Sequence, residues 1–338
     1  QRQIPLGSSV FKRDVAVLTD ISVIFAFEKK GGSMFNYTYE IAECRIQFCS
    51  EVPLQQDAWS VLFQTDRMLY ETDIFCIIKL CKKLPDQQGK LLTQTLTMHL
   101  YREQDLLWQE LLALSDGRVL ARAQYSVNGR ADNRRNEVRL YLAEIEQPWI
   151  NRIAHIWAGM DLGYQLLWQD RLLMHSASVS TGQEIILFAG PSGIGKSTQA
   201  ELWRKYRGAE ILNGDKNMIG VVTDRSSAGT ECRSVMVYGV PFCGTSSICH
   251  SFKKSLQSIV FLEQGEQKEV KQLLGREALT GLLENCIGHP GVAEATAKML
   301  ELAAEVVEQI PVFRLICRPE KEAVEILEQV LVKNIFRE

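Results

Sequence analysis

No apolar stretch in the sequence approaches the ~20 residues that a membrane-spanning helix requires. The first residues also lack the basic, apolar and small-residue order of a secretion signal. Neither sign of charge dominates, because the formal net charge of the 338 residues is only -3, which gives no indication of a polyanionic partner. We therefore expect a cytoplasmic protein with neither a membrane nor a nucleic acid as its partner.

Metal-binding patterns are missing as well. The chain has nine cysteines, but no two of them have the C-x-x-C spacing of zinc or redox sites, and its five histidines form no cluster that would complete a metal site. Several cysteines lie inside apolar runs, as Cys76 does within Ile74–Ile78. We expect free thiols that pack as small buried hydrophobes in a reducing compartment.

Residues 1–33 look foreign to the rest of the chain, because they end in the linker-like Gly31-Gly32-Ser33 and a methionine comes next. Two interpretations remain open: a fused peptide that is a ligand or substrate of the protein beginning at Met34, or a native N-terminal extension. If the segment is a tethered substrate, we expect it to be ordered against the protein and partly paired as a strand. Its candidate acceptor hydroxyls belong to Ser8, Ser9, Thr19 and Ser22.

Residues 34–147 are predicted to form a strand-rich N-terminal region. Apolar residues alternate with polar ones over 42–48, 96–100 and 119–127, and turn signals occur at Asp116-Gly117 and Asn128-Gly129. The pattern indicates antiparallel hairpins and carries no chemical motif. We expect this region to recognise the substrate, since an exposed sheet edge can capture an extended peptide.

Residues 148–338 mix strand and helix signals and are predicted to form the catalytic domain, which makes the fold class α/β (α+β). Apolar residues from Ile150 to Leu167 recur at near-3.6 spacing and predict one helix after Pro148. Two amphipathic helices are expected around 295–307 and 323–330. Strands are expected at 172–179, 184–189, 209–213, 216–223, 231–238, 257–262 and 312–317.

The most informative motif is a G-x-x-x-x-G-K-S/T phosphate loop between the strand 184–189 and the next predicted helix. Its glycines let successive N–H groups point at one anion, and the new helix adds its positive N-terminus. Lys196 can reach the outer phosphates and the Ser197 hydroxyl can ligate Mg²⁺, so ATP and Mg²⁺ are the expected cofactors. The nucleotide-binding residues are Gly190, Pro191, Ser192, Gly193, Ile194, Gly195, Lys196, Ser197 and Thr198.

Two further residues can supply chemistry. Asp215 ends the strand after the loop helix, where a carboxylate can hold Mg²⁺ or accept the proton of an attacking hydroxyl. His175 lies in a strand that a short turn joins to the phosphate-loop strand, so it should lie near the γ-phosphate. The alternatives are a turn aspartate after Asn-Gly and a structural histidine. We name His175, Lys196 and Asp215 as catalytic candidates, with Ser197 and Asp215 for the metal.

The segments His175–Val179, Gly190–Thr198, Leu212–Lys216 and Gly239–Thr245 together resemble the HPr kinase/phosphorylase family. They are also similar to phosphoenolpyruvate-carboxykinase-like P-loop proteins, including kinases of peptide-modifying gene clusters. The likeness covers roughly 150–330. It implies an ATP- and Mg²⁺-dependent kinase that acts on a hydroxyl, built on a mixed, largely antiparallel sheet.

The chain departs from that family at one position, because Gly214-Asp215 stands where relatives often carry two adjacent acids, one acting as base and one supporting the metal. Either Asp215 serves both roles or His175 is the base. Arg233, Arg314 and Arg318 are weak candidates for phosphate contacts, and solvated strand ends are the favoured interpretation. The expected function is transfer of phosphate to a Ser/Thr hydroxyl of a peptide or small protein, such as a modified-peptide precursor. The alternatives are a non-catalytic nucleotide-binding module and a small-metabolite kinase.

Overall fold

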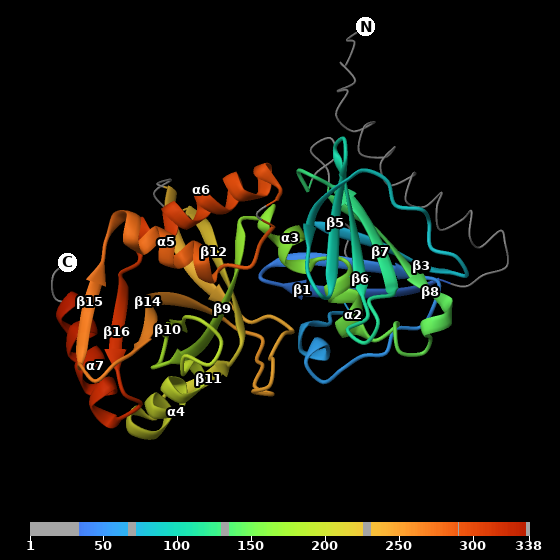
Figure 1. Cartoon of the computed structure of the whole chain (residues 1–338). Coiled ribbons are helices and arrows are strands. Elements are labelled where there is room, and N and C mark those ends of the chain that lie inside the picture. Colours follow the sequence, from blue (N-terminus) through green and yellow to red (C-terminus); the bar gives the residue numbers. More distant parts are fainter. Residues whose placement is uncertain (1–33, 67–71, 130–134, 226–230, 290, 336–338) are drawn as a thin grey trace, which may run out of the picture.

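The computed structural model describes residues 34–66, 72–129, 135–225, 231–289 and 291–335 (Figure 1). Residues 1–33 lie outside these ranges, so the expectations for that segment stay predictions. Within the described ranges, no helix is long and apolar enough to cross a membrane. The eight cysteines whose side chains the structure describes are free, and five of them are buried, in agreement with their expected role as small hydrophobes.

The first sheet contains eight strands in the order β1-β2-β3-β8-β7-β6-β5-β4. The turns at Gly117 and Gly129 join antiparallel neighbours, as the turn signals predicted, and both glycines have positive φ. However, β2–β3 and β3–β8 pair in parallel, so the sheet is mixed and hairpins alone do not build it. The strands are β1 (Phe35–Ile41), β2 (Cys44–Ser50), β3 (Ile74–Cys81), β4 (Lys90–Gln94), β5 (Met98–Glu103), β6 (Leu106–Leu112), β7 (Val119–Ser126) and β8 (Asn136–Ala143).

The prediction of a single helix after Pro148 is wrong. The structure has two short helices instead, α2 (Ile153–Gly159) and α3 (Leu162–Leu167). The break lies at Asp161, which has a left-handed backbone (φ 55°) and whose carboxylate accepts a hydrogen bond from the Tyr164 N–H as the N-cap of α3. The apolar spacing continues across the break, which is why periodicity alone could not reveal it. Two 3₁₀ turns also occur, η1 (Ser60–Phe63) and η2 (Glu144–Glu146).

The second sheet has the order β10-β9-β12-β13-β14-β16-β15, with β11 paired to β9 and β10 paired also to β14. Only β10–β14 and β14–β16 are parallel, so this sheet is mixed and largely antiparallel, as the resemblance implied. The sequence did not reveal β15 or α5. The strands are β9 (Arg171–Ser180), β10 (Glu184–Ala189), β11 (Glu210–Asn213), β12 (Lys216–Arg225), β13 (Glu231–Tyr238), β14 (Lys253–Gln264), β15 (Glu269–Leu273) and β16 (Val312–Cys317).

Helices cover both faces of the second sheet (Figure 1). Along β10 the side chains alternate: Ile185 and Leu187 join the core beneath α5 and α6, whereas Ile186 and Phe188 join the core beneath α4 and α7. Such alternation results from the period of two along a strand. The helices are α4 (Lys196–Arg207), α5 (Gly275–Asn285), α6 (Ala293–Gln309) and α7 (Lys321–Ile335).

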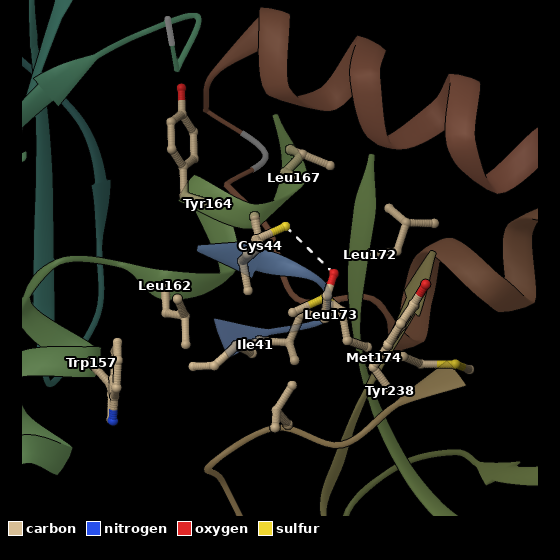
Figure 2. Close-up of a cluster of buried hydrophobic side chains, with 14 of the residues drawn as sticks. Ile41, Cys44, Trp157, Leu162, Tyr164, Leu167, Leu172, Leu173, Met174 and Tyr238 are labelled. Carbon is tan, nitrogen blue, oxygen red and sulfur yellow. Dashed lines mark hydrogen bonds between the residues drawn. The ribbon is translucent and has the colours of Figure 1, made fainter. Parts of the chain in front are cut away.

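One apolar core joins the two sheets. Figure 2 shows Ile41 and Cys44 of the first sheet with Leu162 of α3 and Leu172–Met174 of β9 in the same buried cluster. Polar contacts add to it, because Tyr238 of β13 donates a 2.6 Å hydrogen bond to Glu43 in the β1–β2 turn. The β1–β2 turn therefore lies directly against the second sheet, and the division at 147/148 into separate domains stays a prediction.

Candidate functional site

The glycine-rich loop lies between β10 and α4, with the strand and the helix that the sequence predicted on either side. Gly190, Gly193 and Gly195 have φ values of 142°, 80° and 113°, which other residues rarely adopt. A Cβ added at Gly193 or Gly195 would meet no heavy atom within 4 Å, so this side of the loop is open. The first N–H groups of a helix lack helical partners and point outward. The loop and the start of α4 can therefore receive an anionic group.

Lys196 is the first residue of α4 and is only 7% exposed. Its Nζ donates hydrogen bonds to the carbonyl oxygens of Gly190 (2.8 Å) and Pro191 (3.1 Å). Burial lowers the pKa of this ammonium group, and the negative charge of Asp215 opposes that shift. The cation is thus held inside the loop, within electrostatic reach of the carboxylate on the neighbouring turn.

The turn between β11 and β12 is fixed by Asn213, which is fully buried. Its Oδ1 accepts hydrogen bonds from the main-chain N–H groups of Asp215 (2.9 Å) and Lys216 (3.1 Å). Its Nδ2 donates to the carbonyl oxygens of Phe242 (2.9 Å) and Val240 (3.4 Å). Sequence reasoning assigned Asn213 no role beyond an Asn-Gly turn signal, yet this side chain determines where Asp215 lies.

Asp215 meets His175 because β12 pairs with β9 so that Lys216 lies opposite His175. His175 Nδ1 lies 3.7 Å from Asp215 Oδ1, too long for a hydrogen bond but close enough for charge interaction. Burial lowers the pKa of His175, the positive charges of Lys196 and Lys216 lower it further, and Asp215 opposes them. With its pKa below the ordinary value, the imidazole is mostly neutral near pH 7 and able to accept a proton.

The segment 239–249 forms a wall beside these groups. A Cβ at Gly244 would stand 2.7 Å from Asp215 Cγ, so only glycine permits this approach. The Phe242 ring lies under the ammonium group of Lys216, with 5.6 Å between Nζ and the ring centroid. The segment includes Gly239–Thr245, which carried part of the family resemblance, and the structure brings it to the same site.

The three arginine candidates form ion pairs with glutamates. Arg233 pairs with Glu305 at 2.7 Å and Arg314 with Glu263 at 3.7 Å. Arg318 forms an ion pair with Glu266. These contacts give no support for a phosphate-binding role of the three side chains.

The donor set fits a metal that arrives with a nucleotide. Among the described residues, no group of three or more His, Cys, Asp or Glu side chains could hold a metal ion by itself. Mg²⁺ usually keeps several waters and takes one or two protein oxygens in addition to phosphate oxygens. Ser197 is exposed in the first turn of α4, and the Asp215 side chain is 18% exposed, so a hydroxyl and a carboxylate are accessible to such an ion.

Comparisons with known proteins add little to this geometry. No protein-family model matches the chain, and no curated protein matches it. Among solved structures, the chain is similar to the Hpr(Ser) kinase/phosphatase from Coxiella burnetii, with a TM-score of 0.25 and 11% sequence identity. That similarity covers 48% of this chain and 94% of the other. Similarity at this level carries no conclusion about activity.

Proposed function

We propose that the chain is a kinase that uses ATP and Mg²⁺ to phosphorylate a Ser/Thr hydroxyl of a peptide or small protein. The observation that carries the proposal is the environment of Asp215. Its carboxylate lies 3.7 Å from His175 and acts electrostatically on Lys196, the cation of the phosphate loop. Phosphoryl transfer needs a phosphate cradle, a cation, a metal-binding carboxylate and a proton acceptor, and these residues can supply each of them.

In the proposed reaction, the loop amides and Lys196 hold the phosphates and stabilise the charge that develops on them. Ser197 and Asp215 would hold Mg²⁺, which neutralises phosphate charge when bound. The acceptor oxygen forms a bond to the γ-phosphorus while the bond from that phosphorus to the bridging oxygen breaks, and ADP leaves. The hydroxyl proton passes to a protein group.

Two groups can accept that proton. His175 has a lowered pKa and is half-buried, so a neutral ring is available at the site. Asp215 is the alternative, but its Oδ2 already contacts the Lys216 ammonium at 2.8 Å. The division of roles therefore depends on whether Asp215 mainly holds the metal, in which case His175 is the base.

A peptide acceptor is favoured by the first sheet, whose order begins with β1 and ends with β4. Main-chain groups at a sheet edge can bind an extended peptide by strand addition. Residues 1–33 are one candidate peptide, because they carry four Ser/Thr hydroxyls ahead of Gly31-Gly32-Ser33. A nucleotide-binding module without transfer activity would need the loop but not the carboxylate beside His175, so Asp215 favours the kinase.

Intact mass spectrometry tests the proposal. The full chain, and a chain beginning at Met34 with or without free peptide 1–33, are incubated with ATP and Mg²⁺. We expect a mass gain of one phosphate on the full chain, located by fragmentation to one hydroxyl of residues 1–33. The same incubation with Lys196→Ala is the control and should give no gain. Nucleotide binding without any phosphorylation of peptides or small hydroxyl compounds would favour the non-catalytic module.

A further inference from the structure

Lys216 lies beside Asp215 in the site, and sequence reasoning assigned it no role. Its Nζ is 2.8 Å from Asp215 Oδ2, and its side chain is 29% exposed. On its other side the ammonium lies over the Phe242 ring. The carboxylate proposed to hold Mg²⁺ therefore has one oxygen already engaged by a lysine.

The backbone of Lys216 is fixed, whereas its side chain has freedom to change partner. The N–H group donates to Asn213 Oδ1, and the residue pairs with His175 across β9 and β12. Lysine carries its charge on a flexible four-carbon stem with three rotatable donors. The ammonium can thus leave Asp215 without moving the strand.

The neighbouring charges indicate where the Lys216 ammonium group would move. Lys196 and Lys216 both act electrostatically on His175, so both cations lie near the same point. A divalent cation that takes Oδ2 of Asp215, alone or together with Oδ1, competes with the ammonium group for Oδ2. When the metal binds to Asp215, the displaced ammonium lies next to the phosphates that arrive with the metal.

Gly214 explains why the turn offers Lys216 only one carboxylate. A Cβ at Gly214 would stand 2.5 Å from the Ser246 Cβ and 2.6 Å from its Oγ, so this packing has no room for an acidic side chain at 214. The turn therefore holds a single carboxylate beside Lys216.

We propose that Lys216 is a further catalytic residue, whose ammonium group exchanges Asp215 for the transferring phosphoryl group when nucleotide and metal bind. No covalent bond changes at Lys216, because only its ion-pair partner changes. The proposal rests on the proposed kinase function, but its first two tests use binding and do not require an acceptor.

Lys216→Met tests the proposal, with Lys253→Met as the matched control. Lys253 also forms an ion pair, with Glu43 at 2.5 Å, and its Nζ lies 5.9 Å from the ring centroid of Tyr238. It lies outside the proposed site. Lys253→Met therefore measures only the general effect of removing a lysine that has an ion pair and an aromatic neighbour. Thermal unfolding of both variants checks that they are folded.

The first measurement is Mn²⁺ binding to the protein saturated with ADP, by electron paramagnetic resonance. Lys216→Met should tighten Mn²⁺ binding by roughly two- to fivefold, the size expected for release from a partly exposed ion pair. The second is the affinity for ATP and for ADP in the presence of Mg²⁺. Lys216→Met should weaken ATP binding relative to ADP binding several-fold, because only ATP has the phosphoryl group that the ammonium would contact. Lys253→Met should change none of these.

The third measurement is turnover, where Lys216→Met should lower kcat on the order of 10²-fold. Unchanged Mn²⁺ binding would overturn the exchange of partners. Tighter Mn²⁺ binding with equal changes in the affinities for ATP and ADP, or with an unchanged kcat, would make Lys216 a counter-ion of Asp215 and overturn its catalytic role. If the unmodified protein transfers phosphate to no acceptor, the proposed function fails, while the two binding measurements still decide whether Lys216 changes partner.

Discussion

The side chain of Ser246 fills the space beside Gly214. A Cβ built at position 214 would approach the Ser246 Cβ to 2.5 Å, closer than real Cβ atoms come. Ser246 is itself held in place, because its Oγ donates a 2.6 Å hydrogen bond to the Cys243 carbonyl. The segment 239–249 thus packs tightly against the turn that carries Asp215.

Gly214→Ala should lower the free energy of unfolding by about 1–3 kcal/mol, the usual cost of overpacking. In a chain that already carries Ser246→Gly, the same change should cost much less, because the two Cβ atoms no longer collide. Chemical denaturation of the four chains of this double-mutant cycle measures the coupling. Additive losses would mean that the two residues do not compete for space.

Lys196→Ala should lower phosphoryl transfer by on the order of 10²-fold or more and leave the fold intact, because it removes the cation of the phosphate loop. Lys254→Ala is the matched control. Lys254 of β14 also donates to a main-chain carbonyl, that of Gly182 at 2.7 Å, which lies outside the phosphate loop. Turnover at saturating ATP is the measurement. Near-normal turnover of Lys196→Ala would remove this lysine from the reaction.

Asp215→Asn should keep ATP binding and lose most activity. An amide fills the same space, yet it cannot accept a proton and binds Mg²⁺ less well. Asp170→Asn is a suitable control, since Asp170 is another aspartate paired with a lysine, Lys298 of α6, at 2.7 Å. Nucleotide affinity and turnover are measured on both variants. Wild-type turnover of Asp215→Asn would leave Asp215 as a turn residue and favour the non-catalytic module.

The pH dependence of turnover distinguishes His175 from Asp215 as the proton acceptor. Burial and the charges of Lys196 and Lys216 lower its pKa below the ordinary value of 6.5, so the neutral ring predominates at pH 7. If this ring accepts the proton, turnover should decline only as the pH falls below that ordinary value. His175→Gln should slow the reaction by about 10²-fold or more and flatten this acidic limb. A mutant with the wild-type profile would assign proton transfer to Asp215.

The phosphate loop and its flanking elements could be predicted from sequence because their signals are local. A glycine pattern, a short apolar run and a helix start lie within residues 184–198, and the structure has a strand and a helix at these places. The adjacency of His175's strand to the loop strand was also predicted, and β9 does pair with β10. A short turn leaves consecutive strands few alternatives to pairing.

Features that depend on distant residues could not be predicted in this way. The parallel pairing of β2 with β3 has no local signal, because parallel neighbours need a crossover connection instead of a tight turn. Asp161 breaks a helix without interrupting the apolar spacing, because its left-handed backbone keeps both short helices against the core. The contact of Lys216 with Phe242 and the packing of Ser246 on Gly214 join segments that are distant in sequence, and neither has a sequence signature.

A buried ion pair connects the α5–α6 segment to the helix break between α2 and α3. His289 is 9% exposed, and its Nε2 contacts Asp161 Oδ2, which also accepts a 3.2 Å hydrogen bond from the Tyr125 hydroxyl. Burial alone would lower the pKa of His289, but the charge and hydrogen bond of Asp161 raise it above its ordinary value. Burial would raise the pKa of Asp161, but His289 and the hydrogen bonds from Tyr164 and Tyr125 lower it.

The two shifts set a pH window for stability. A raised histidine pKa contributes stability that is complete below about 6.5 and is lost as the pH rises through the higher, folded-state pKa. A lowered aspartate pKa contributes stability above about 3.9, which is lost as the pH falls through the folded-state pKa. The pair should therefore contribute most between about pH 4 and 6.5. Burial raises the pKa of Tyr125 and Tyr164, so neither ionises in this window.

His289→Gln should consequently destabilise the protein more at pH 6 than at pH 9, by about 3 kcal/mol at the lower pH, because it leaves a buried carboxylate without its cation. Urea denaturation of both proteins at the two pH values gives the difference. His155→Gln is the control: His155 Nδ1 lies 2.8 Å from the Trp149 carbonyl, and burial lowers the pKa of this histidine, so its contribution to stability changes with pH in the opposite direction. An equal loss at pH 6 and pH 9 for His289→Gln would mean that His289 is neutral when folded, and that the contact with Asp161 is a hydrogen bond rather than an ion pair.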